Sequence, residues 1–301
     1  MPSLGLFQRD LRAGAAVSQA KARQALLEDA GKDVTTNALK LKGKAHAFIV
    51  AKESGVLCGV LEANAALQGL NVGWKVKEGH SFKKGQVLCE ISGEAKRLLA
   101  GERTALNYLM ILSGIATLTR GWVEKFGPRV ATLRKTHPLL SASEKRAVLA
   151  GGGLTHRLTL ADGYLVKENH VSALANERKL SRLEALKLAV RTAKRHREAS
   201  QGKERKRAHR LFVEVEVRSF SEAVAAAGEK PDALLVDNCT AKEVRRIVNH
   251  LRPKYPKMVF EASGGINEKN ASFYLRAGAD FVSSSALTLQ ARPIDLSLLL
   301  E

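Results

Sequence analysis

From residue 130 onward, short apolar runs alternate with longer stretches in which apolar residues recur every three or four positions. The short runs are typical of buried strands, and the longer spacing is typical of helices that cover them. The expected strands are Val130–Leu133, Tyr164–Lys167, Phe212–Val217, Ala233–Val236, Met258–Ala262 and Phe281–Ser284. The expected helices are Ser141–Ala150, Ala173–His196, Ser219–Ala227, Ala241–Leu251 and Glu268–Ala277. This alternation predicts an α/β unit built on a parallel sheet or barrel.

The pattern before residue 127 is different. An amphipathic helix is expected over residues 15–29, with a turn at residues 33–36, and a long apolar helix over residues 94–126. Ser113 and Gly114 interrupt that long helix and indicate a bend or close packing. Between these helices, short strands separated by glycine turns predict a small antiparallel sheet, with strands at 48–50, 55–61, 72–76 and 84–88.

These two patterns of apolar positions predict two domains. The first is expected over residues 1–126 and the second over residues 127–285, with a tail of residues 286–301 that packs back on the first domain.

Composition narrows the class of protein. The chain has 301 residues, of which 45% are apolar, so it can bury a substantial core. Its net charge of +19 favours an anionic partner, but aromatic residues make up only 5%, which argues against a nucleic-acid binder that stacks bases. Three widely spaced cysteines, with no secretory signal and no apolar run long enough to span a membrane, favour a reduced, cytoplasmic setting.

A basic run lies between Lys194 and Arg210, where eight residues are Lys or Arg. Such runs usually form a solvated helix end and loop. The alternatives are that this run steers anions or contacts RNA.

Polar side chains collect at the ends of the predicted strands. In a barrel of parallel strands, the C-terminal strand ends surround one opening, the mouth of the barrel, and the active site lies there. Cations gathered at that mouth would bind a small, highly charged anion. The candidate residues at or just past these ends are Arg134, Lys135, Arg157, Lys167, Asn169, His170, Glu214, Glu216, Asp237, Asn238, Ser263, Ser283, Ser284 and Ser285.

Two features among them indicate phosphate chemistry. Ser263, Gly264 and Gly265 precede a predicted helix and form a backbone cradle for an anion. Glu214 and Glu216 share one face of their strand, and Glu216, nearer its end, is favoured as the functional one. Carboxylates among cations are consistent with Mg²⁺ bound to a diphosphate, so the site predicts a phosphorylated sugar diphosphate reacting beside a small acid.

The chain resembles the quinolinate phosphoribosyltransferase family over nearly its whole length. The matching motifs are Glu102-Arg103-Thr104-Ala105-Leu106-Asn107, Ser113-Gly114-Ile115-Ala116-Thr117, Arg134-Lys135-Thr136, Gly151-Gly152-Gly153 with His156-Arg157, Lys167-Glu168-Asn169-His170, Val213-Glu214-Val215-Glu216-Val217, Asp237-Asn238 and Glu261-Ala262-Ser263-Gly264-Gly265-Ile266. The resemblance implies an α/β sandwich followed by an incomplete α/β barrel. It also implies an obligate homodimer, sometimes assembled further to a hexamer, that converts quinolinate and PRPP to nicotinate mononucleotide, diphosphate and CO₂.

The resemblance also assigns roles to residues. It places Arg103 in the active site of the neighbouring subunit, whereas spacing alone favours a structural pair with Glu102. Arg134, Lys135, His156, Arg157 and Lys167 would hold the quinolinate carboxylates and PRPP phosphates. Glu216 and Asp237 would bind the ribose and Mg²⁺, and Ser263, Gly264 and Gly265 the 5′-phosphate. The residues expected to act in catalysis are Glu216, Asp237, Lys135 and Lys167.

Four positions depart from the family pattern. Leu133 stands where the family has Thr, Leu139 and Ser141 where it has Gly and Arg, and Ser285 where it has a Gly beside the phosphate. These departures leave two alternatives open: a related enzyme acting on a different aromatic acid, and a basic nucleic-acid-binding protein on an inactive scaffold.

Overall fold

The computed structural model describes residues 14–200 and 211–301, so residues 201–210 of the basic run lie outside the described residues. The chain forms two units. The described parts of Arg129–Arg134 and Leu154–Ser285 make the parallel-sheet unit, and those of Arg9–Pro128, Lys135–Gly153 and Ala286–Glu301 make the antiparallel-sheet unit. A boundary at residue 127 would place residues 135–153 with the parallel sheet, whereas they pack in the other unit.

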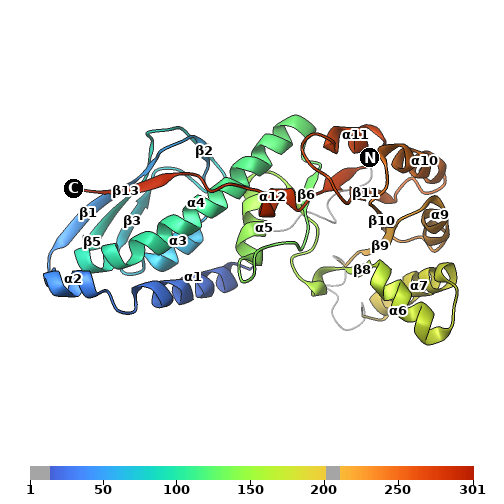
Figure 1. Cartoon of the computed structure of the whole chain (residues 1–301), viewed down its shortest axis with the longest axis horizontal. Helices are drawn as coiled ribbons and strands as arrows, with labels where there is room; N and C mark the ends of the chain where they lie inside the picture. The colour runs from blue at the N-terminus through green and yellow to red at the C-terminus, as the bar shows by residue number, and fades with distance from the viewer. Residues whose placement is uncertain (1–13, 201–210) are drawn as a thin grey trace. The chain divides into compact units, whose positions relative to one another are not determined.

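Seven parallel strands form the curled sheet of the first unit (Figure 1). They are β6 (Val130–Thr132), β7 (Leu154–Thr155), β8 (Tyr164–Val166), β9 (Val213–Val217), β10 (Ala233–Asp237), β11 (Val259–Ser263) and β12 (Phe281–Ser283). Their order is β7-β6-β12-β11-β10-β9-β8. Because β7 and β8 follow one another in sequence but stand at opposite edges, the barrel stays open between them, which confirms the predicted fold class.

Helices connect these strands. They are α6 (Glu168–Arg178), α7 (Arg182–Ser200), α9 (Phe220–Gly228), α10 (Ala241–Leu251) and α11 (Ala271–Arg276), with a 3₁₀ turn at Leu160–Asp162. The single helix predicted over residues 173–196 was wrong: Lys179 adopts a left-handed φ of 53° and ends α6, and Ser181 then pairs with Glu184 at the start of α7. Helix α9 is capped at its N-terminus, because Ser219 Oγ accepts a hydrogen bond from Glu222 N (3.2 Å).

The parallel sheet carries an apolar layer near the beginnings of its strands. This buried cluster contains Ala131, Leu154, Phe212, Ala233, Val259 and Phe281. Two residues further along, the same face becomes polar, with His156 after Leu154, Glu214 after Phe212 and Glu261 after Val259. The apolar layer closes one end of the sheet and leaves the polar residues toward the C-terminal strand ends.

The second unit is built on an antiparallel sheet of order β13-β1-β5-β3. Its strands are β1 (Lys44–Ala51), β3 (Asn71–Trp74), β5 (Val87–Glu94) and β13 (Leu296–Leu300), beside a small ribbon of β2 (Gly55–Val56) and β4 (Ser81–Phe82). Its helices are α1 (Ala15–Ala30), α2 (Val34–Leu39), α3 (Val60–Ala66), α4 (Ala95–Phe126), α5 (Ser141–Ala150) and α12 (Ala286–Leu289). The tail forms β13 and pairs with β1.

Two predictions in this unit were wrong. The strand expected over residues 55–61 ends at Val56 and gives way to α3, whose N-terminal amides Gly59 N and Val60 N donate to the Glu78 carboxylate. The turn expected at residues 33–36 starts helix α2, because Asp33 accepts a hydrogen bond from Thr36 N (2.9 Å). Close packing at Gly114 is confirmed: a Cβ there would lie 2.1 Å from the Arg292 carbonyl oxygen.

Across residues 14–200 and 211–301, no helix combines the length and apolarity needed to cross a bilayer.

Candidate active site

A cluster of charged side chains lies at the C-terminal ends of β8, β9 and β10. Lys167 follows β8, Glu216 lies near the end of β9, and Asp237 ends β10. The strand register pairs Leu235 of β10 with Glu216, so the two acidic strand ends are neighbours. Lys167 Nζ lies 4.0 Å from Glu216 Oε2. Three of the residues selected from the sequence therefore lie in one region.

Arg218 is the residue of this cluster that the sequence reasoning missed. Its guanidinium pairs with Glu216 Oε1 (3.2 Å), Glu168 Oε2 (3.2 Å) and Asp237 Oδ2 (3.5 Å). The signal was available, because Arg218 continues the two-residue spacing that runs through Glu214 and Glu216. We will refer to Arg218 and its three carboxylates as the Arg218 cluster.

Beneath these strand ends lies a fully buried polar group that combines an imidazole and two carboxyls. His156 Nε2 contacts Glu214 Oε2, and it lies 3.4 Å from Glu261 Oε2. Ser283 Oγ donates to Glu261 and lies 3.0 Å from Ser263 Oγ. These contacts join β9, β11 and β12 with the segment after β7, and they fix the position of the His156 ring.

Burial raises the pKa of both carboxyls in this group. Desolvation raises the pKa of Glu214 to about 8, although hydrogen bonding to Glu261 and the charges of Arg157 and Lys167 oppose the shift. Desolvation, reinforced by the Glu214 charge, raises the pKa of Glu261 well above its ordinary value. The donor atoms of His156, Glu214 and Glu261 lie within 4.8 Å of one another and could also ligate a metal ion. Their mutual hydrogen bonding favours a shared proton over an ion.

This group predicts a pH dependence of stability. Because the folded protein keeps a proton on Glu261 that the unfolded chain releases above about pH 4.5, folding binds protons in this range. The Glu261 contribution to the free energy of unfolding is therefore full below pH 4.5 and declines as the pH rises toward the raised pKa. Urea unfolding from pH 5 to 8 should show a shallower decline for Glu261→Gln than for wild type. A parallel decline in both proteins would contradict the shift, and Glu177→Gln, at an exposed carboxyl, is the control.

Two arginines near this group, Arg134 and Arg157, are close enough for their charges to interact. Arg157 is buried, and its Nη1 donates to the Gly163 carbonyl (3.1 Å). Burial lowers the pKa of Arg157, and repulsion from the exposed Arg134 guanidinium lowers it further. Two guanidinium groups close enough to repel each other form a site that an anion stabilises.

The glycine cradle follows β11. Gly264 has a φ of 86°, and a Cβ there would lie 2.4 Å from Asn238 Oδ1, so a larger residue would displace the loop after β10. Gly265 also has a positive φ of 62°. The helix expected over residues 268–277 is shorter than predicted, because α11 begins only at Ala271 and has six residues. The cradle therefore consists of loop backbone alone, and Ser285, two residues beyond β12, is partly exposed.

The remaining candidates belong to the antiparallel-sheet unit. Lys135 is exposed, and its carbonyl accepts a hydrogen bond from Thr288 Oγ1 (2.7 Å). Arg103 is exposed on α4 in a hollow of about 470 Å³ that Asp29 and Tyr108 also line. Within the described ranges Arg103 forms no ion pair with Glu102, so the structural pair favoured by spacing is not formed.

Leu139 adopts a left-handed φ of 66° with its side chain 67% exposed. Non-glycine residues rarely adopt this conformation. The backbone here thus keeps the conformation of the glycine that the family pattern expects, and Leu139 is strained in it.

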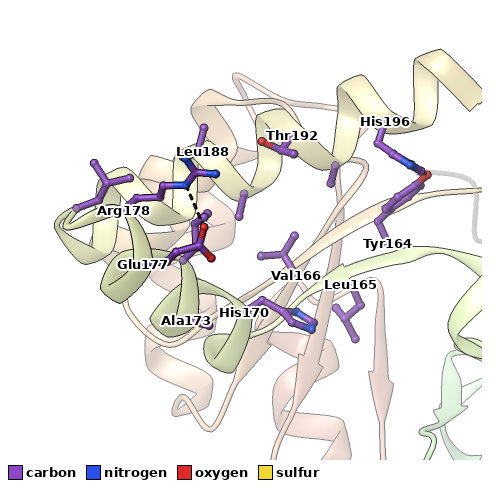
Figure 2. A pocket seen from close by; sticks show the side chains of 14 residues that line it. Tyr164, Leu165, Val166, His170, Ala173, Glu177, Arg178, Leu188, Thr192 and His196 are labelled. Carbon is purple, nitrogen blue, oxygen red and sulfur yellow. Dashed lines mark hydrogen bonds and ion pairs between the residues drawn. The ribbon is translucent and has the colours of Figure 1, made fainter.

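A separate hollow of about 1130 Å³ lies between β8, α6 and α7 (Figure 2). Tyr164 and His196 point toward each other there and are hydrogen-bonded (2.7 Å), and Arg178 pairs with its neighbour Glu177 (3.4 Å). Most of the remaining lining is aliphatic, as Leu165, Val166 and Leu188 show. This hollow lacks the converging cations of the strand ends.

Comparison with known proteins gives a consistent result over most of the chain. A family model described as quinolinate phosphoribosyl transferase, C-terminal domain, matches residues 115–299, and the N-terminal domain of the same description matches residues 33–113. A nicotinate-nucleotide pyrophosphorylase (carboxylating) of Mycobacterium leprae is 35% identical over 288 residues, covering 92% of this chain and 94% of its own. A probable enzyme of that name from Methanothermobacter thermautotrophicus is also 35% identical over 288 residues, covering 92% of this chain and 96% of its own. The solved nicotinate-nucleotide pyrophosphorylase of Francisella tularensis superposes with a TM-score of 0.79 at 28% identity, covering 95% of this chain and 97% of that one.

Proposed function

The chain belongs to the quinolinate phosphoribosyltransferase family, and we propose that it acts as a carboxylating nicotinate-nucleotide pyrophosphorylase of NAD biosynthesis. In the proposed reaction, the phosphoribosyl group of PRPP passes to the ring nitrogen of quinolinate. Decarboxylation then gives nicotinate mononucleotide, diphosphate and CO₂.

The observation that carries the proposal is the separation of charges at the strand ends. Arg157, buried and repelled by Arg134, provides a site for the carboxylates of a small diacid. Glu216 and Asp237, on neighbouring strands, provide acidic groups suited to the sugar. We assign Arg134, His156 and Arg157 to quinolinate. Lys135 and Lys167 are assigned to the phosphates, and Ser263, Gly264 and Gly265, with Ser285 nearby, to the 5′-phosphate.

The proposed chemistry needs no protein nucleophile. As the bond from C1 of ribose to diphosphate breaks, positive charge develops at C1, and the pyridine nitrogen forms the new bond there. Glu216 stabilises the charge at C1, while Lys135 and Lys167 stabilise the departing diphosphate. The bond to the C2 carboxylate then breaks, CO₂ leaves, and the ring nitrogen stabilises the electron pair until C2 takes up a proton.

The carboxylates of Glu216 and Asp237 fit a magnesium ion. Both are oxygen donors at adjacent strand ends, and Mg²⁺ is usually held by one or two carboxylates together with substrate phosphates. Mg²⁺ bound there would neutralise negative charge on the diphosphate. We therefore propose Mg²⁺ as the cofactor.

We further propose that the enzyme is a homodimer in which Arg103 reaches the active site of the partner subunit. The support is that Arg103 is exposed and forms no ion pair with Glu102 within the described ranges, although Thr104 and Ala105 beside it on α4 are buried. A cytoplasmic location is also proposed, because the described cysteines Cys58, Cys89 and Cys239 are all free thiols.

The direct test is turnover by the purified chain. With quinolinate, PRPP and Mg²⁺ together we expect nicotinate mononucleotide and CO₂ in equal amounts, and no product when any one of the three is omitted. The product is followed by chromatography and the CO₂ by carbon-14 release from labelled quinolinate. A folded protein that binds PRPP but gives no product from quinolinate would contradict the proposal.

The alternative is the same transfer to a different aromatic acid. It is favoured by the strained Leu139 and by the unusual Leu133 and Ser141 in the same segment. A panel of pyridine mono- and dicarboxylates assayed under the same conditions distinguishes the two substrates.

A further inference from the structure

The Arg218 cluster puts a protein cation on the same carboxylates that the proposed function assigns to Mg²⁺. The guanidinium contacts Glu216 and Asp237 at 3.2 Å and 3.5 Å, and Glu168 at 3.2 Å. The side chain of Arg218 is 45% exposed, whereas those of Glu216 and Asp237 are 9% and 15% exposed. The guanidinium thus covers the two carboxylates from the solvent side.

The backbone of Arg218 is held in place independently of its side chain. Its N–H donates to Glu222 Oε2 (2.8 Å), and its carbonyl accepts from Cys239 Sγ (3.4 Å). The three ion pairs of the side chain are all to carboxylates. The guanidinium can therefore leave these carboxylates by side-chain rotation, without unfolding the strand end.

A guanidinium and a divalent cation cannot both use the same carboxylate oxygens at full strength. Arginine does not lose its proton in proteins, so its charge persists at every working pH. The three carboxylates of the cluster are balanced in part by the positive charges of Arg218 and of the neighbouring Lys167. The net charge at the place where Mg²⁺ would bind is therefore about −1. Without Arg218 that charge would be about −2, and the oxygens would be unobstructed.

We propose that Arg218 is a built-in competitor of the divalent ion at Glu216 and Asp237, which weakens metal binding to the enzyme without diphosphate. When the diphosphate of PRPP arrives, its oxygens provide both additional metal ligands and a new partner for the guanidinium. Arg218 therefore makes metal binding depend on the substrate. This inference rests on the proposed function, because it takes Glu216 and Asp237 as the metal-binding carboxylates.

The experiment measures Mn²⁺ binding to the full-length protein by electron paramagnetic resonance, without substrate. We expect Arg218→Ser to bind Mn²⁺ roughly tenfold more tightly than wild type, the factor that corresponds to removing one strong ion pair. Arg218→Lys, which keeps a charge, should bind close to wild type. With saturating inorganic diphosphate the difference between Arg218→Ser and wild type should shrink.

Arg191→Ser is the matched control. Arg191 is an arginine of the same unit with a comparable exposure of 51%, and it pairs with Glu229 at 3.3 Å. Its removal should leave Mn²⁺ binding unchanged. Arg218→Gln, which preserves the length of the side chain, serves if the serine variant is unstable.

Unchanged or weaker Mn²⁺ binding in the folded neutral variants would overturn the inference. Tighter binding that persists when Glu216→Gln and Asp237→Asn are added would also overturn it, because the ion would then lie elsewhere. Turnover of quinolinate and PRPP by wild type is measured separately. Failure of the proposed function is thereby distinguished from failure of this inference.

Discussion

Arg134→Ala and Arg103→Ala are each expected to reduce kcat/KM for quinolinate by about 100-fold, because in the proposed site each would remove a charge-assisted contact to a substrate anion. If Arg103 acts in the partner's site, a heterodimer of one subunit of each kind has one site with both arginines and one site with neither. Heterodimers isolated through two different affinity tags should then recover about half of the wild-type activity, since two-fold symmetry gives two equivalent sites. Steady-state assays on the isolated heterodimers measure this recovery.

The control pairs Arg134→Ala with Arg157→Ala. Both residues lie in the parallel-sheet unit, the Arg134 charge lowers the pKa of Arg157, and both are assigned to quinolinate in the proposed site. Their heterodimer has one defect in each site, so no recovery is expected. If the Arg103→Ala and Arg134→Ala heterodimer is no more active than its parents, Arg103 does not act in trans.

Sequence periodicity predicted the parallel strands well and the local breaks poorly. Helices α5 and α10 have the predicted bounds, because amphipathic spacing and flanking loops agree there. Strand β7 was missed because it has only two residues, Leu154 and Thr155, and no alternation can be recognised over that length. Residues 55–61 read as an apolar strand, yet α3 starts at Val60 because the distant Glu78 side chain accepts hydrogen bonds from its first amides. A contact of that kind leaves no local signature.

The candidate site also contains some residues that the sequence predicted and others that it could not predict. Strand-end position predicted Lys167, Glu216 and Asp237, because parallel strands end at one edge. The pairing of His156 with Glu214 and Glu261 could not be predicted, since it depends on how the sheet curls to bring separate strands together. Arg218 continues the two-residue spacing of Glu214 and Glu216, but it was missed because it lies beyond the end of the strand.

The antiparallel-sheet unit contains a buried ion pair whose residues have no part in the proposed site. Arg146 Nη2 lies 2.7 Å from Glu62 Oε2, and both side chains are almost fully buried. Ser143 Oγ also donates to Glu62 Oε1 (2.5 Å) and lies 3.0 Å from Ser18 Oγ. The pair thereby connects α1, α3 and α5. Arg146 Nη1 is buried without a hydrogen-bond partner, so the pair is not fully satisfied.

Arg146→Ala is therefore expected to lower the free energy of unfolding by about 3–5 kcal/mol, because it leaves the Glu62 carboxylate buried without a counter-charge. Replacing both partners together, as Glu62→Leu with Arg146→Met, should cost far less, since neither charge then remains buried. Arg97→Ala provides the contrast: Arg97 pairs with Glu94 at 2.9 Å, but both side chains are more than half exposed, and a loss below about 1 kcal/mol is expected. Urea unfolding followed by circular dichroism measures all three. Equal losses for Arg146→Ala and for the double variant would show that the loss comes from packing volume and not from the unpaired charge.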